Sequence, residues 1–171
     1  MNTERIAQTF HFETPPHVMI VEGRYHHAIA DLQMQGVKAI LDRINATYEI
    51  VTVPGALEIP AAISYAMKAL DFDPLRRRAE GYIALGCIIK GGTTHDLIVG
   101  SESTRSLQEL AIRHALAIGN GILTCLTVEE ALERADPAKT NRGGEAANAC
   151  LRMIELKNKF HLSPKRRWVA K

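Results

Sequence analysis

The residues best suited to chemistry lie in the stretch Gly86–His95, which closes with two glycines, two threonines and a histidine. A histidine can gain or lose a proton near neutral pH, so His95 is the candidate for proton transfer. The preceding Gly92 and Thr93 offer exposed backbone amides and a hydroxyl, which are groups that bind an anion such as phosphate. The stretch matches neither GxGxxG nor GxxxxGK[ST], so it does not indicate nucleotide binding.

Each of these features also occurs without a function. A Gly-Gly-Thr-Thr turn is found in many proteins that bind no ligand, and a lone loop histidine is more often a surface residue. Glu58 could serve only the first turn of its own helix. We expect His26 and His27 to face water at the start of a helix. The remaining histidines have no companions that suggest a metal site, and we predict none.

The elements that must position these residues alternate along the chain. Short, continuous apolar runs are typical of strands covered on both faces, and they occur at 18–21, 50–53, 82–89 and 122–126. Helical patterns lie between and after them, over 25–45, from Pro60 to Leu70, over 101–118, from Thr127 onward and over 144–160. Such alternation predicts an α/β fold in which helices cover both faces of a four-stranded parallel sheet.

Length and composition predict one folded domain. The chain has 171 residues, of which 46% are apolar and 23% charged, as in soluble globular proteins. Residues 1–17 carry Pro15-Pro16 and no clear period, so we expect an extended arm there, followed by a single domain over 18–160. The net charge of +2 resides largely in a basic tail over 161–171 and argues for neither nucleic acid nor a membrane as partner.

The cysteines indicate a reducing compartment. Cys87, Cys125 and Cys150 are odd in number and none forms a CxxC pair, so we predict buried, reduced thiols. No apolar run approaches the length of a membrane span, and the start of the chain lacks the pattern of a signal peptide. We therefore expect a cytoplasmic protein.

Three loops should form the ligand site. Open parallel sheets bind ligands at the carboxyl ends of their strands. In this sequence those ends carry Glu22–Tyr25, Pro54–Glu58 and Lys90–His95. The third loop has the clearest chemical character, and the other two should lie beside it.

Five segments together resemble one family, 6,7-dimethyl-8-ribityllumazine synthase, the penultimate enzyme of riboflavin biosynthesis. The resemblance covers nearly all of 18–160, and its segments are Gly23–Tyr25, Val53–Pro60, Gly86–His95, Asn120–Thr124 and Arg142–Ala147. It implies a three-layer, flavodoxin-like sandwich. It also implies the condensation of 5-amino-6-(D-ribitylamino)uracil with 3,4-dihydroxy-2-butanone 4-phosphate, with no metal and no organic cofactor.

The resemblance assigns roles to individual residues. His95 would transfer protons, and Tyr25 would stack on the pyrimidine ring, where the family usually carries Phe or Trp. The residues implied to bind the ribitylaminouracil are Tyr25, Ala56, Leu57, Glu58, Cys87, Ile88, Ile89 and Asn120. The residues implied to bind the butanone phosphate are Gly92, Thr93 and Arg134.

Two of these residues are expected far from His95. His95 follows the carboxyl end of its strand, whereas Asn120 begins the predicted fourth strand and Arg134 closes the helix after it. Both should therefore lie at the opposite edge of the sheet, about 20 Å away for a strand of six residues. A neighbouring subunit would then complete each active site, as in the pentamers of the family.

The sequence also bears on the number of subunits in the assembly. The segment from Ala135 to Thr140 lacks the Gly-Thr-Lys type of turn common in family members that form 60-subunit shells. A free pentamer, or a decamer made of two pentamers, is favoured over a capsid. The N-terminal arm is a candidate to add to a neighbour's sheet.

Two other functions stay open at this point. One is a pentameric riboflavin synthase of the archaeal type, whose ligands carry no phosphate, so the phosphate-binding set argues against it. The other is a weakly active paralogue that binds riboflavin or lumazine. A receiver-type signalling module would need clustered acids at two strand ends, where this chain carries Glu22 and Lys90.

Overall fold

The structure is a computed structural model that describes residues 9–10 and 12–162. Its strands are β1 (His17–Gly23), β2 (Thr47–Val53), β3 (Gly81–Ile89) and β4 (Ala117–Cys125). Its helices are α1 (His27–Arg43), α2 (Ile59–Phe72), α3 (His95–Arg113), α4 (Val128–Ala135) and α5 (Arg142–Lys159), with a short 3-10 helix, η2, at Ala56–Glu58.

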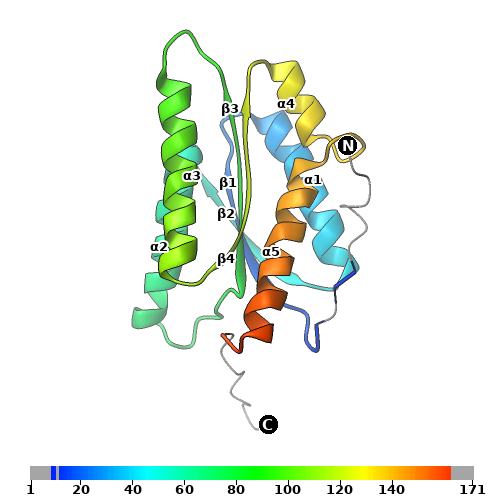
Figure 1. Ribbon diagram of the computed structural model, residues 1–171, viewed down its shortest axis with the longest axis vertical. Coiled ribbons are helices and arrows are strands. Elements are labelled where there is room, and N and C mark those ends of the chain that lie inside the picture. Colours follow the sequence, from blue (N-terminus) through cyan, green and yellow to red (C-terminus); the bar gives the residue numbers. More distant parts are fainter. Residues whose placement is uncertain (1–8, 11, 163–171) are drawn as a thin grey trace.

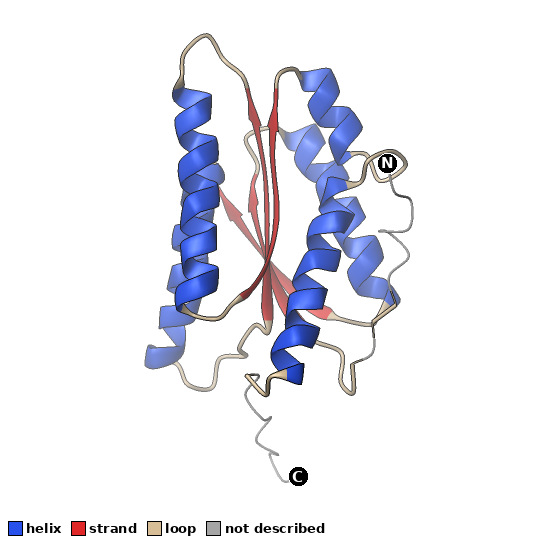
Figure 2. Cartoon of the chain, in the orientation of Figure 1, coloured by secondary structure: helices blue, strands red, loops and turns tan. Residues whose placement is uncertain are grey.

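The four strands form one parallel sheet in the order β2-β1-β3-β4. Helices α2 and α3 cover one face, and α1, α4 and α5 cover the other, which gives the three layers seen in Figure 1 and, coloured by element type, in Figure 2. The predicted α/β fold of the flavodoxin-like type is confirmed.

Burial along the strands explains their sequences. Every residue of the central β1 is buried, and β3 is buried over most of its length. The edge strand β4 instead alternates between buried and more exposed positions. Strand β2, at the opposite edge of the sheet, has no fully buried residue. A strand with helices on both faces buries side chains on both sides, which is why the middle of each inner strand is a continuous apolar run.

Each face of the sheet has its own core. Ile20 and Ile83 pack with α1 and α5 on one side, while Val21 packs with α2 and α3 on the other. Helix α5 lies directly on β4, because a Cβ atom added to Gly119 would come within 1.9 Å of the Ala146 carbonyl oxygen. The glycine is therefore required by the close approach of the two backbones.

The helix predicted over 101–118 differs most from the structure. Helix α3 begins at His95 and ends at Arg113, and β4 begins at Ala117. The apolar residues around Leu116 continue the helical period, but Ala115 has a φ of 48° and breaks the helix there. At the other end, Asp96 lies in the first turn, where a negative charge stabilises the helix dipole.

The remaining predicted elements are confirmed with shifts at their ends, the largest at β4 and β2, which begin five and three residues before their predicted starts. The Thr127 side chain accepts a hydrogen bond from the Glu130 amide at 3.2 Å and begins α4 as expected. Helix α5 begins at Arg142, two residues before the predicted start, with Asn141 as its N-cap. The predicted arm pairing and basic tail fall largely on 1–8 and 163–171, outside the described residues.

Among the described helices, none combines the length and apolar character that crossing a membrane requires.

Candidate active site

A pocket of about 470 Å³ lies at the carboxyl ends of β1, β2 and β3. The chain runs from β1 outward to β2 and then crosses to β3 on the other side of β1. Ligands bind at this point of reversal in such sheets. We call this hollow the strand-end pocket, and its lining includes Tyr25, His26, Ala56, Leu57, Glu58, Cys87, Ile88, Ile89, Gly91, Thr93, His95 and Asp96.

The loop after β1 brings an aromatic ring to the pocket. The Tyr25 side chain is 77% exposed, and its ring meets the His26 ring edge-on at a centroid distance of 5.0 Å. A ring this exposed has a face free for a planar ligand. His26 is half-buried and lines the pocket, so it is less exposed than predicted, whereas His27 is exposed as predicted.

The loop after β2 supplies the next wall. Ala56 is buried, while Leu57 and Glu58 are exposed on the short helix η2. The Glu58 carboxylate lies beside Gly55, where an added Cβ would be 3.3 Å from Oε2. An apolar side chain next to a carboxylate suits a ligand that carries hydroxyl groups on a carbon chain.

The end of β3 forms the floor. Cys87, Ile88 and Ile89 are its last three residues, and all three line the pocket. Burial, together with a smaller contribution from the nearby Cys125 thiol, raises the pKa of the Cys87 thiol to about 12. With this pKa the Cys87 thiol stays protonated at neutral pH. Because only the thiolate is a strong nucleophile, Cys87 serves as part of the pocket wall and not as a reactive group.

His95 is the first residue of α3. Its backbone N–H donates to the Thr93 hydroxyl at 3.4 Å, and the Thr94 side chain makes no cap. The first amides of a helix have no partner within the helix and carry partial positive charge, so they attract an anion. The adjoining Gly91 and Gly92 have no atom within 4 Å of where a Cβ would stand, which leaves room for a ligand over the loop.

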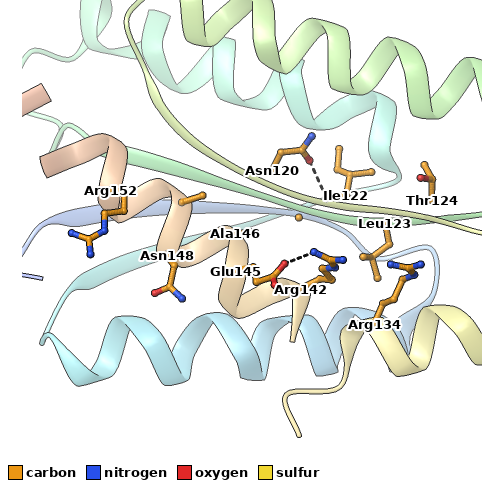
Figure 3. Close-up of a pocket in the computed structure, with 12 residues that line it drawn as sticks. Asn120, Ile122, Leu123, Thr124, Arg134, Arg142, Glu145, Ala146, Asn148 and Arg152 are labelled. Carbon is orange, nitrogen blue, oxygen red and sulfur yellow. Dashed lines mark hydrogen bonds and ion pairs between the residues drawn. The ribbon is translucent and has the colours of Figure 1, made fainter. Parts of the chain in front are cut away.

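A second hollow of about 540 Å³ runs along the edge strand β4 and the helices α4 and α5. We call it the edge pocket. Its charged lining is mostly basic, as Figure 3 shows, and its polar residues are Asn120, Thr124, Arg134, Arg142, Glu145, Asn148 and Arg152. Nine of the twelve predicted site residues line the strand-end pocket and Gly92 adjoins it, but Asn120 and Arg134 belong to the edge pocket.

A carboxylate pairs with each of the three arginines of the edge pocket. Arg134 donates to Glu130 through Nε at 2.9 Å, with its Nη2 2.7 Å from the same oxygen. This hydrogen bond raises the pKa of Arg134, while the Leu126 amide and Arg134 lower the pKa of Glu130. On α5, Arg142 pairs with Glu145 through Nη1, and Arg152 pairs with Glu155 through Nη1 at 2.7 Å. All three guanidinium groups remain partly exposed.

The predicted placement of Asn120 and Arg134 at the opposite end of the sheet is wrong. Asn120 is the fourth residue of β4, opposite Ala84 in the middle of β3. Helix α4 has only eight residues, so Arg134 returns about 12 Å along the sheet and lies beside Leu123 and Thr124. The two residues are separated from His95 across the sheet and not along its strands, since they lie at the outer edge formed by β4.

A family model described as 6,7-dimethyl-8-ribityllumazine synthase matches residues 15–158. The chain belongs to this family. The match spans the strands and helices that form both pockets, so the resemblance inferred from the five segments is confirmed.

Relatives named as lumazine synthases match over most of their length. The 6,7-dimethyl-8-ribityllumazine synthase of Bartonella tribocorum is 47% identical over 146 residues, which are 85% of this chain and 92% of the relative. The 6,7-dimethyl-8-ribityllumazine synthase 1 of Rhizobium meliloti is 48% identical over 85% of this chain and 94% of the relative. That of Paramagnetospirillum magneticum is 39% identical over 85% and 97%.

Sequence reasoning missed two basic residues of this lumazine synthase family member. Arg142 and Arg152 line the edge pocket with Arg134, although neither had been given a role. Arg142 stands directly before Gly143, where a Cβ would come within 2.2 Å of the Gln33 carbonyl oxygen. The position of Arg142 next to a glycine required by a close helix contact could have indicated its role in the pocket. The position of Arg152 in the middle of α5 gave no such indication.

Among the described residues, no three histidine, cysteine or acidic side chains gather as metal ligands would.

Proposed function

We propose that the protein condenses 5-amino-6-(D-ribitylamino)uracil with 3,4-dihydroxy-2-butanone 4-phosphate, giving 6,7-dimethyl-8-ribityllumazine, phosphate and water. The observation that carries the proposal is that Tyr25, Glu58 and His95 converge on one pocket in a member of the lumazine synthase family. The relatives that cover most of the chain bear the name of this enzyme.

The strand-end pocket would hold the pyrimidine substrate. Its ring would stack on Tyr25, and its ribityl chain would lie along Ala56 and Leu57 with the Glu58 carboxylate accepting hydrogen bonds from the hydroxyls. The end of β3, at Cys87–Ile89, would meet the ring with its backbone groups. The pocket's volume of about 470 Å³ suits one small organic molecule.

The phosphate of the second substrate would lie over the loop before α3. Gly92 and Thr93 offer amides and a hydroxyl there, at the positive end of a helix of 19 residues. Arg134 would add a planar, permanently charged fork for the phosphate oxygens. It would come from another subunit, because within one chain it lines a different pocket.

His95 would move protons between the two substrates. The uracil amine must attack a ketone, phosphate must leave, and the ring must close with loss of water. Holding both substrates in reactive geometry accounts for most of the acceleration. The imidazole of His95 would accept a proton and return it during these steps, as a general acid and base.

Neighbouring subunits would share each site. We propose a homopentamer, or a pair of pentamers, in which Asn120 and Arg134 of one subunit face the strand-end pocket of the next. The support is that the predicted residue set is divided between two pockets of the same chain, with Asn120 and Arg134 in the edge pocket. We assign the reaction to residues 18–160 as one domain, and we place it in the cytoplasm, which suits three free thiols.

The direct test is to mix the purified protein with both freshly made substrates and follow the fluorescence of the lumazine product. Fluorescence should rise only when both substrates are present, and phosphate should be released in equal amount. No product would contradict the proposal. Conversion of lumazine alone to riboflavin would instead indicate the archaeal type of riboflavin synthase, and tight riboflavin binding without turnover would indicate a binding paralogue.

A further inference from the structure

A buried carboxylate lies just behind the strand-end pocket and outside its lining. Glu22 is the next-to-last residue of β1, and its side chain is only 5% exposed. A carboxylate removed from water needs charged or hydrogen-bonding partners. Arg24 donates to both of its oxygens, at 3.1 and 3.3 Å, and the Thr52 hydroxyl of β2 donates to Oε1 at 3.1 Å.

The guanidinium of Arg24 then reaches in a second direction. Its Nη2 donates to Asp31 at 2.5 Å, and Asp31 lies in the second turn of α1. These hydrogen bonds raise the pKa of Arg24, with the bond to Asp31 as the largest cause. One planar fork therefore ties the end of β1 to α1 across the loop between them, which a lysine, with its compact charge, would do less well.

The backbone of the same loop is locked from below. A Cβ added to Gly23 would come within 2.8 Å of the Gly55 carbonyl carbon, and the Arg24 amide donates to the Val53 carbonyl at 3.4 Å. The loop after β1 therefore rests directly on the loop after β2. Both loops line the strand-end pocket, so they are positioned as one unit.

Only Tyr25 and His26 lie between these fixed points. The Tyr25 ring is 77% exposed and its recorded ring contact is with His26, so packing does little to hold it. Its position is set by the backbone, and the backbone is set by Arg24 on one side and α1 on the other.

We infer that Glu22, Arg24, Asp31 and Thr52 form a clamp that positions Tyr25 for ligand binding. The inference rests on the proposed function in that the ligand is the pyrimidine substrate or the lumazine formed from it. The four residues touch neither substrate; they are positioning residues that act through the Tyr25 ring. Fixing a ring before binding improves affinity because less ordering is needed when the ligand arrives.

The test uses Asp31→Asn, because Asp31 is 58% exposed and its change leaves Glu22 paired with Arg24. Replacing Arg24 by an apolar residue would strand a buried carboxylate and can unfold the chain. In Asp31→Asn the dissociation constant of 6,7-dimethyl-8-ribityllumazine, followed by its fluorescence, should rise about tenfold while kcat stays unchanged. Asp31→Glu should restore most of the affinity. Glu102→Gln, which breaks an exposed pair with Arg105 on α3, is the matched control and should bind like the wild type.

A double-mutant cycle separates positioning from general loosening. If the clamp acts through Tyr25, Asp31→Asn should no longer weaken binding once Tyr25→Ala is present. Equal weakening in both backgrounds, or no weakening in either, would overturn the inference. Without any ligand, backbone amide exchange over 23–27 should be faster in Asp31→Asn, and unchanged exchange would also overturn it. A wild type that makes no lumazine would contradict the proposed function, whereas normal catalysis with an ineffective Asp31→Asn would contradict the clamp alone.

Discussion

The strand-end pocket and the edge pocket differ in the kind of group that each offers. The strand-end pocket carries an aromatic ring, a carboxylate and the titratable His95. The edge pocket carries three arginines, which pair with the carboxylates of Glu130, Glu145 and Glu155. Groups that exchange protons are therefore gathered on one surface, and groups with permanent positive charge on another.

This separation follows from the sheet. Parallel strands bring their following loops to the same end, so the loops after β1, β2 and β3 must meet there. The edge strand β4 instead offers one open side, which is available to another molecule. A reaction that needs both kinds of group is therefore best performed where the open edge of one subunit meets the strand ends of another.

The largest expected effect is on turnover in His95→Ala. With proton transfer removed, kcat should fall about a hundredfold while the KM of both substrates changes little. Steady-state kinetics of lumazine formation provides the measurement, with His27→Ala as the exposed control. An unchanged kcat would remove His95 from the mechanism.

Arg134→Ala should act on binding of the phosphate substrate. Loss of a charged hydrogen-bond donor should lower kcat/KM for the butanone phosphate about thirtyfold. The KM of the ribitylaminouracil should stay close to that of the wild type. Equal losses for both substrates would mean that the edge pocket does not serve the phosphate.

Mixing these two variants tests whether the pockets combine between subunits. Each variant alone should be impaired, but in the proposed pentamer a mixed ring would contain some junctions with an intact His95 facing an intact Arg134. After joint unfolding and refolding at equal amounts, about a quarter of the sites should be wild type. Activity no higher than the average of the separate variants would show that each subunit uses its own pair.

Glu130→Gln should have a smaller effect, because it removes only the partner that orients Arg134. A partly exposed ion pair contributes little, so the KM of the butanone phosphate should rise about threefold. Glu133→Gln, on the exposed side of the same helix, is the control. A loss as large as that of Arg134→Ala would indicate that Glu130 itself contacts the substrate.

The last prediction concerns stability, and its effect is absent at neutral pH. The folded chain raises the pKa of Cys87 and of Cys150 to about 12, from an ordinary value of 9.0. Above pH 9 the unfolded thiols lose protons that the folded chain retains, so the free energy of unfolding should decrease from about pH 9 towards pH 12. Urea unfolding of the wild type and of Cys87→Ala should give a shallower decrease in the variant. Parallel curves would mean that the wall of the strand-end pocket does not hold the thiol protonated.

Much of the fold could be predicted because the inner strands are covered on both faces. The apolar runs around Ile20 and Ile83 predict buried strands. Thr127 predicts a helix start because its hydroxyl can accept a hydrogen bond from a first-turn amide. The boundaries of α3 could not be predicted in the same way. Leu116 continues a helical pattern, and only the backbone turn at Ala115 shows that the helix has ended.

The candidate site was also predictable in one part and not in another. The types of Tyr25, Glu58, Thr93 and His95 and their places after strands predict one pocket from sequence, because parallel strands bring these loops together. The distance between His95 and Arg134 does not follow from strand length, since it depends on α4 being short and on β4 lying at the edge.

By itself the sequence determined the α/β class, the family and the pocket at the strand ends, because apolar periods and loop chemistry are local properties of the chain. Tertiary structure alone decided which side chains share a hollow. It placed His26 in the strand-end pocket, added Arg142 and Arg152 to the edge pocket, and joined Glu22 to Arg24 and Asp31. These contacts depend on strand order and on how closely neighbouring backbones approach, and neither is written in any short stretch of sequence.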